Sequence, residues 1–184
     1  MRLAITGTPG VGKHTVARIV ADRLGMRLVD INEVAMSSAI IAMDESTYIV
    51  DTDRLEDIFR GVEDNVLLVG HLAPYVLDGD KVDLAVVLRR SPYELREVYR
   101  QRGYSEDKAK DNLQSEILGI ITHDAVKRFG DHKVVEVDCT GRSVGDVADE
   151  IIRIVRHEQD GMLGHVDWLA IVVQRDELRE FFDY

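Results

Sequence analysis

Short apolar runs alternate with segments of helical periodicity along most of the chain. Continuous apolar runs, which are typical of strands buried on both faces of a sheet, occur at residues 66–69 and 83–88. Shorter runs predict three more strands, at residues 3–5, 27–30 and 133–137. Apolar residues at helical spacing predict the intervening helices, at 15–24, 30–41, 52–62, 91–102, about 105–129 and 144–155. Strands separated by helices predict an α/β fold with a five-stranded parallel sheet and right-handed crossovers.

Turn and cap residues support several of these boundaries. Gly25 suits the C-cap of the first helix, and Ser91 with Pro92 suits the start of the helix at 91–102. A loop is expected at residues 44–46. The length of 184 residues, without repeats or a low-complexity linker, predicts one domain over residues 1–184. The tail at about 160–184 is expected to form a helix that docks on the same domain.

A glycine-rich segment joins the first predicted strand to the first predicted helix. Residues 7–15 read GTPGVGKHT, with Lys13 directly before the helix. Glycines let successive backbone N–H groups point at phosphate oxygens, and the helix N-terminus adds partial positive charge. The lysine neutralises the β- and γ-phosphates. Strand, glycine-rich loop, lysine and helix together predict a phosphate-binding loop.

One position of this loop departs from the usual pattern. The pattern G-x-x-x-x-G-K-[ST] places a hydroxyl after the lysine as a magnesium ligand, but residue 14 is histidine and the hydroxyl comes at Thr15. Nucleoside monophosphate kinases of the adenylate kinase type also lack that hydroxyl, because they carry G-x-P-G-x-G-K-G-T. The loop resembles this version with His14 in place of a glycine. His14 either contacts phosphate or points to solvent.

Composition excludes several other classes of function. The net charge of −11 argues against a direct nucleic-acid groove and suits a basic protein partner or high solubility. No apolar stretch approaches 18 residues, so no membrane span is expected, and no signal peptide is expected either. Cys139, the single cysteine, is expected to be a buried strand residue in a cytoplasmic protein. The six histidines show no zinc-ligand spacing.

Four segments in order resemble one family, the atypical adenylate kinases of isoenzyme-six type from archaea and eukaryotic nuclei. They are the loop at 7–15, the segment YIVDTDRL at 48–55, LLVGHL at 67–72, and RGYSEDKAKDNLQSEI at 102–117. The last is similar to the family's lid pattern R-G-Y-x-x-x-K-x-x-[DE]-N-x-x-x-E. The resemblance implies a three-layer P-loop nucleoside monophosphate kinase fold. It also implies a monophosphate-binding segment at about 30–53 and a lid at about 101–111.

The resemblance implies broad-specificity transfer of phosphate, chiefly from ATP to AMP, together with ATP hydrolysis. It also implies a role in small ribosomal subunit and rRNA maturation through binding of a small-subunit ribosomal protein. Many family members carry an acidic residue two positions before the histidine of the third segment, where this chain has Val69. Mg²⁺ is therefore expected to be held mainly through phosphates and water, with no direct protein ligand.

Candidate site residues follow from the loop and from the resemblance. Lys13, Arg102 and His71 are expected to be catalytic. ATP is expected to contact the loop, the lid and the turn after the last strand, at Gly10, Val11, Gly12, Lys13, His14, Thr15, Arg102 and Arg142. Substrate binding is assigned to Asp30, Asp51 and Asp53. Alternatives remain for several of them: pairing with Glu106 for Arg102, a structural hydrogen bond for His71, and helix capping for Asp51 and Asp53.

Arg89 and Arg90, after the fourth predicted strand, are expected either to face the phosphates or to lie on the surface. Two other functions also remain open. One is an assembly factor whose ATP binding gates a protein interaction, with little kinase activity. The other is a kinase of another small molecule, such as shikimate or dephospho-coenzyme A, against which the lid pattern argues.

Overall fold

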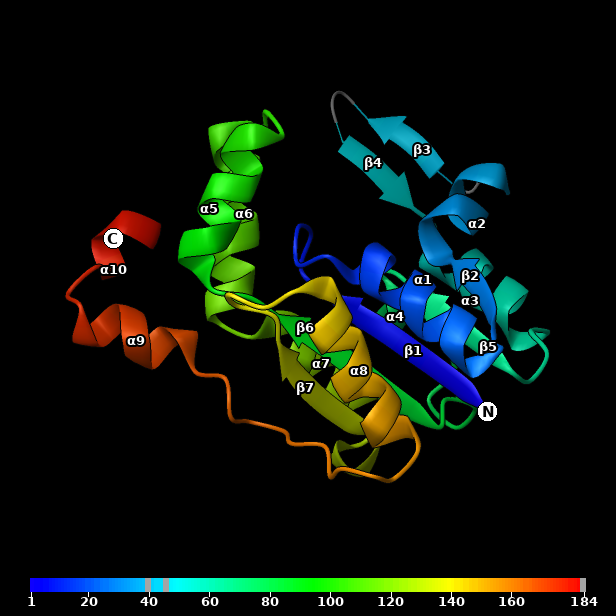
Figure 1. The fold of residues 1–184 in the computed structure, drawn as a ribbon. Helices are drawn as coiled ribbons and strands as arrows, with labels where there is room; N and C mark the ends of the chain where they lie inside the picture. The colour runs from blue at the N-terminus through cyan, green and yellow to red at the C-terminus, as the bar shows by residue number, and fades with distance from the viewer. Residues whose placement is uncertain (39–40, 45–46, 183–184) are drawn as a thin grey trace.

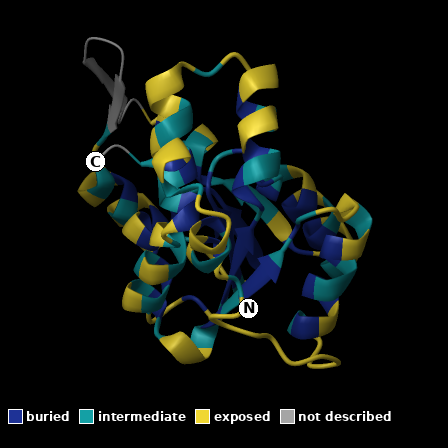
Figure 2. Cartoon of the chain, turned by 90° about the vertical axis from the view of Figure 1, so that its left-hand side faces the viewer, coloured by how far each residue is buried: buried dark blue, intermediate teal, exposed yellow. Residues whose placement is uncertain are grey.

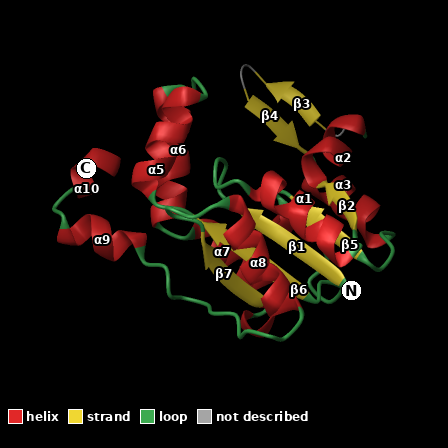
Figure 3. Ribbon diagram, in the orientation of Figure 1, coloured by secondary structure: helices red, strands yellow, loops and turns green. Residues whose placement is uncertain are grey.

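The computed structural model describes residues 1–38, 41–44 and 47–182. Its centre is a parallel sheet in the order β2-β5-β1-β6-β7. The strands are β1 (Arg2–Gly7), β2 (Arg27–Asp30), β5 (Val66–Val69), β6 (Leu84–Arg89) and β7 (Val134–Asp138). The predicted five-stranded parallel sheet is confirmed (Figures 1 and 3). β2 and β5 have the predicted bounds, and the ends of the other strands differ from the prediction by at most two residues.

Helices cover both faces of this sheet and make three layers (Figure 1). Side chains alternate along each strand: Leu3 and Ile5 of β1 face one apolar core, and Ala4 between them faces the other. The first core includes α1 (Lys13–Leu24) and α8 (Val144–Val155), and the second includes α3 (Thr52–Arg60), α4 (Ala73–Val76) and α7 (Ile120–Phe129). Figure 2 shows the sheet buried between these layers, with exposed residues on the outer helix faces.

The region after β2 differs from the prediction. The helix expected at 30–41 ends early, as α2 (Ile31–Ser37), and two strands follow, β3 (Ile41–Asp44) and β4 (Thr47–Val50). These strands pair only with each other, antiparallel, and project away from the central sheet (Figure 1). The segment is rich in β-branched residues, which favour strands. Of the expected loop at 44–46, Asp44 ends β3 and residues 45–46 lie outside the described part.

The expected long helix at 105–129 is two helices, α6 (Glu106–Ile117) and α7. Gly119 separates them with φ +65°, a left-handed conformation that ends one helix and redirects the chain into the next. The expected caps are confirmed: Gly25 is left-handed at the end of α1, and Ser91 accepts a hydrogen bond from the Tyr93 N–H at the start of α5 (Pro92–Gln101). The short α4 and a 3₁₀ turn, Asp131–Lys133, were not predicted.

The C-terminal tail forms two short helices in place of one. They are α9 (Trp168–Gln174) and α10 (Leu178–Phe181), and they lie beside α5 and α6 (Figure 1). Phe181 is buried, its ring packs edge-on against Tyr93 of α5, and its carbonyl accepts a hydrogen bond from Gln114 of α6 at 2.7 Å. The tail therefore covers the helices that flank the expected lid. Among the described residues, no helix is long and apolar enough to cross a membrane.

Candidate active site

The phosphate-binding loop lies at the carboxyl end of β1, between the strand and α1. Gly10 has φ +96°, and a Cβ atom there would lie 2.9 Å from the Tyr99 ring of α5, so both conformation and space require glycine. Gly12 is the left-handed residue that precedes the first turn of α1. In the first turn of α1, the Thr15 and Val16 N–H groups donate to the Gly12 carbonyl at 3.1 Å. The helix N-terminus carries partial positive charge, which favours binding of an anion at the loop.

Lys13 is buried beside this loop. Its side chain is 4% exposed, and Nζ lies 3.4 Å from the Thr8 carbonyl oxygen, to which it donates. Loss of solvent, and then the positive charge of Arg102, lower the pKa of Lys13 to about 8, while Asp30 and Glu116 act in the opposite direction. At neutral pH the amine remains mostly charged but poorly solvated, and this favours a phosphate counter-ion.

His14 faces the end of β2. Its Nε2 atom lies 3.1 Å from Oδ2 of Asp30, whose other oxygen accepts a hydrogen bond from the Asn32 N–H at 2.9 Å and caps α2. Burial outweighs the attraction of the carboxylate, so the pKa of His14 lies below its usual value. The side chain therefore contacts Asp30, and a contact between His14 and phosphate stays a prediction.

His71 follows β5 and is half-buried near the same loop. Loss of solvent, and then the charges of Lys13 and His14, lower the pKa of His71 to about 4. The imidazole is thus neutral at pH 7, with one nitrogen able to donate a hydrogen bond and the other able to accept. The structure brings His71 within electrostatic reach of Lys13, His14 and Asp30, and its catalytic role stays a prediction.

Arg102 lies within electrostatic reach of Lys13. It is the C-cap of α5, it is exposed, and its charge acts on the amine of Lys13. Tyr104 begins the connection to α6, and its ring stacks on that of Tyr99 with the centroids 5.1 Å apart. Lys13 is therefore within electrostatic reach of both His71 and Arg102, although the three residues are far apart in the sequence.

Comparison with known proteins shows the family of this chain. The profile of a family described as "AAA domain" matches residues 3–119. A protein of Thermococcus kodakarensis named "Putative adenylate kinase" is 35% identical over 175 residues, which are 93% of this chain and 94% of that protein. One of Methanocaldococcus jannaschii with the same name is 34% identical over 190 residues, 100% of this chain and 97% of that protein. This chain belongs to the AAA domain family and to the adenylate kinase-like family of these relatives.

A solved structure supports the fold of this adenylate kinase-like chain. Shikimate kinase from Aquifex aeolicus superposes with a TM-score of 0.56 and 14% identity, over 86% of this chain and 98% of that one. At so low an identity the likeness shows the fold alone. The predicted three-layer fold of a P-loop kinase is confirmed.

Other candidate residues of this adenylate kinase-like chain hold structural positions. Asp51 caps α3 by accepting from the Arg54 N–H at 3.1 Å, and the exposed Asp53 lies in the first turn of that helix. Arg142 donates to the Asp138 carbonyl at 2.9 Å and pairs with Glu150 of α8 at 2.6 Å. The assignments of these residues to AMP or to adenine stay predictions.

Neither expected position of Arg89 is correct. Its side chain is buried, with Nε 2.8 Å from Glu116 Oε1 and a further ion pair to Glu136. Arg90 pairs with Glu94 at 2.8 Å in the first turn of α5.

The sequence did not reveal the roles of Thr8 and Tyr99, which hold the loop by side-chain hydrogen bonds. For Glu116, the one signal in the sequence was its match to the final glutamate of the lid pattern.

Binding of Mg²⁺ mainly through phosphates and water stays a prediction. Val69 ends β5 and is 1% exposed, so no carboxylate occupies that position. No group of three or more His, Cys, Asp or Glu residues within the described ranges could hold a metal. Cys139 is buried, as expected, but it directly follows β7 and is not itself a strand residue. Burial raises the pKa of its thiol to about 12.

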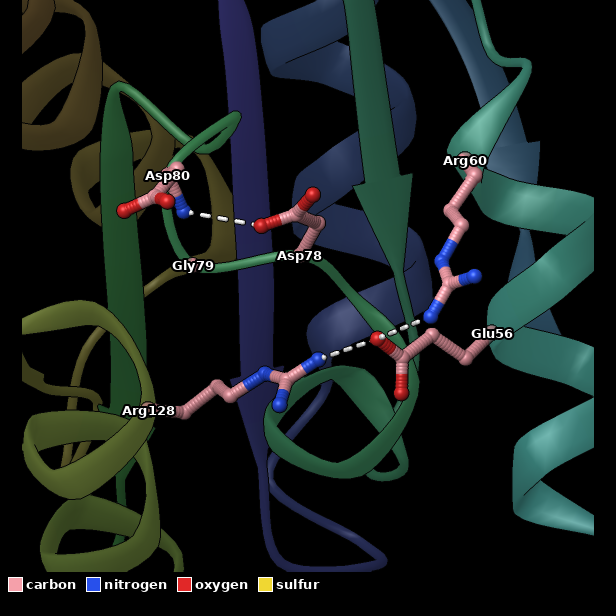
Figure 4. Close-up of a pocket in the computed structure, with 6 residues that line it drawn as sticks. All are labelled: Glu56, Arg60, Asp78, Gly79, Asp80 and Arg128. Atoms are coloured by element: carbon pink, nitrogen blue, oxygen red, sulfur yellow. Dashed lines mark hydrogen bonds and ion pairs between the residues drawn. The ribbon is translucent and has the colours of Figure 1, made fainter.

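A separate polar hollow lies at the opposite end of the sheet (Figure 4). It is lined by Gly79 and by charged residues of α3, α7 and the loop before β6, namely Glu56, Arg60, Asp78, Asp80 and Arg128. Glu56 pairs with Arg128 at 2.9 Å and lies 3.6 Å from Arg60. These arginines are neutralised within the hollow, which lies at the amino ends of β5 and β6, away from the phosphate-binding loop.

Proposed function

We propose that this protein is a broad-specificity nucleoside monophosphate kinase of isoenzyme-six type, which chiefly converts ATP and AMP into two ADP and also hydrolyses ATP. The observation that carries the proposal is the phosphate-binding loop with Lys13 buried beside it, together with His71 and Arg102 within electrostatic reach of this lysine. The identity to proteins named as adenylate kinases, over nearly the whole chain, supports the choice of substrates.

The reaction needs positioning and charge neutralisation more than covalent chemistry. An oxygen of the AMP phosphate attacks the γ-phosphorus of ATP, the bond from that phosphorus to the β–γ bridging oxygen breaks, and the electron pair stays on the departing ADP. Lys13 and the loop N–H groups hold the donor phosphates, and Arg102 moves onto the transferring group. Mg²⁺, held through phosphates and water, neutralises charge when it is bound. Neutral His71 orients water or phosphate by hydrogen bonding.

A second candidate function is an ATP-gated assembly factor with little kinase activity. The observation that favours it is Val69, buried at a position where many members of the isoenzyme-six type carry an acidic residue. ADP formation from ATP plus AMP, measured beside ADP formation from ATP alone, distinguishes the two. A large excess in the presence of AMP supports the kinase, and equal rates support the assembly factor.

The role in small ribosomal subunit maturation is proposed for either case. The net charge of −11 suits a basic small-subunit ribosomal protein, and such attraction mainly speeds encounter and weakens with salt. We expect a pull-down from native cytoplasm at low salt to recover such a protein, with the amount changed by ATP. Recovery of none, with or without ATP, would leave this chain a metabolic kinase only.

The titration of Lys13 predicts how ATP affinity depends on pH. Because the pKa of Lys13 is lowered to about 8, the amine is charged below that pH and loses its charge above it. The Kd for ATP is therefore expected to be nearly constant between about pH 7 and 7.5 and to rise above about pH 8. Lys13→Arg is the matched control, since its guanidinium stays charged throughout. The same pH dependence in both proteins would contradict the assignment.

His14→Gly is expected to be tolerated, because it restores the residue of ordinary adenylate kinases. Turnover should stay of the same order, and stability should fall by about 0.5–1 kcal/mol because glycine is a poor helix residue. Coupled turnover assays and urea unfolding measure the two effects. Complete loss of turnover in the folded variant would show that His14 has a catalytic role of its own.

A further inference from the structure

The carboxylate of Glu116 is buried and fully engaged. The residue is 2% exposed, at the end of α6. Its Oε2 atom accepts from the Thr8 hydroxyl at 2.6 Å. Its Oε1 atom accepts from Arg89 Nε at 2.8 Å, the Arg90 N–H at 3.1 Å and Trp168 Nε1 at 3.1 Å. One oxygen is thus committed to the phosphate-binding loop, and the other to the protein scaffold.

Thr8 connects this carboxylate to the phosphate-binding lysine. It is 1% exposed and follows directly on β1. Its carbonyl oxygen accepts from Lys13 Nζ at 3.4 Å and from the Val11 N–H at 3.4 Å. The side chain of Thr8 is therefore held by α6, while its backbone contacts the lysine and the turn of the loop.

A second contact holds Pro9, the residue after Thr8, and comes from α5, the helix before α6. The Tyr99 hydroxyl of α5 donates to the Pro9 carbonyl at 2.5 Å, and Tyr99 is 1% exposed. The first half of the loop is thus bonded to α5 and α6, the two helices that the Arg102 connection joins. Arg89 also donates to the Glu116 main-chain oxygen at 2.8 Å, which holds this end of α6 in place.

We propose that Glu116 is a positioning residue that sets the conformation of the phosphate-binding loop through the Thr8 hydroxyl. This inference rests on the proposed binding of ATP at the loop. A loop held in its binding conformation loses less freedom when phosphate binds, so affinity rises without any contact between Glu116 and the ligand. Hydrogen bonds to a buried charged group are among the strong ones, and this makes the carboxylate suitable for the task.

Three variants separate this role from general packing. Thr8→Val keeps the shape and removes the hydroxyl, and Thr8→Ser keeps the hydroxyl. Trp168→Phe is the matched control, because it removes a donor from the same carboxylate but from Oε1, away from the loop. Calorimetry gives the Kd for ATP, kinetics give KM for ATP and for AMP, and amide exchange without nucleotide reports on Thr8 and residues 10–12.

We expect Thr8→Val to weaken ATP binding about tenfold, to raise KM for ATP and not for AMP, and to speed exchange in the loop. Thr8→Ser and Trp168→Phe should bind ATP as the wild type does. Equal ATP affinity and loop exchange in wild type and Thr8→Val would overturn the inference and leave the proposed function standing. An equal loss of ATP affinity in Trp168→Phe would also overturn the inference, because the loss would then come from packing around Glu116 and not from the Thr8 hydroxyl. Failure of the wild type to bind ATP would overturn the proposed function itself.

Discussion

Replacing Lys13 by alanine is expected to lower turnover by at least about 10²-fold, in line with the removal of a transition-state donor. Lys13 is the buried cation of the phosphate-binding loop, and its amine contacts only the Thr8 carbonyl among the hydrogen bonds identified in the described part of the chain. In a poorly solvated site the missing charge is not replaced by water at low cost. Coupled measurement of ADP with saturating ATP and AMP gives the effect.

The variant should remain folded, because the substitution also removes the cost of burying a charge. Arg23→Ala is a suitable control, since Arg23 lies at the other end of α1 and pairs with Asp149 on the surface. It removes one positive charge from the same helix and should leave turnover unchanged. Near-normal turnover by folded Lys13→Ala would contradict the assignment of the loop as the phosphate site.

Arg102→Ala is expected to lower phosphoryl transfer by roughly 10²–10³-fold, with a smaller effect on ATP binding. An arginine that moves onto a transferring phosphoryl group stabilises charge that develops in the transition state, so its loss acts on kcat. Arg102 ends α5, and its charge already acts on Lys13 in the absence of nucleotide. Single-turnover kinetics, with ATP affinity measured separately, distinguish the two effects.

Arg100 provides the matched control for this prediction. It lies two residues earlier on α5, its side chain is 73% exposed, and it pairs with Glu97 at 2.6 Å. Arg100→Ala should therefore leave both transfer and ATP affinity near their wild-type values. Equal losses in Arg100→Ala and Arg102→Ala would mean that net charge, and not the position of Arg102, determines the rate.

The central sheet could be predicted because its strands are buried on both faces. Such strands read as continuous apolar runs, as at β5 and β6, and each is followed by a helix. The β3–β4 pair could not be predicted in the same way. Its strands are four residues each and pair with one another only, so their pattern is set by a local hairpin and not by the sheet. The apolar residues from 30 to 41 fit the spacing of one helix, so the sequence predicted a longer α2 than the structure has, and that prediction was wrong.

The phosphate-binding loop was predicted because its chemistry is local: glycines, a lysine and a helix start occur in nine consecutive residues. Glu116 and Arg89 were harder to assign, since their roles depend on contacts across the fold. Thr8 and Glu116 are 108 positions apart in the sequence. Charged residues at strand and helix ends are usually exposed, and nothing local indicated that Arg89 would be buried between two glutamates.

We propose that the γ-phosphoryl group of ATP moves to AMP at this loop. The most direct measurement follows ATP labelled in its γ-phosphate, incubated with the protein, Mg²⁺ and an excess of AMP, with the products separated. We predict that most of the label appears in ADP, that omission of AMP diverts it to a slow release of inorganic phosphate, and that Lys13→Ala abolishes both. Label found only in inorganic phosphate, at a rate that AMP does not change, would contradict the account.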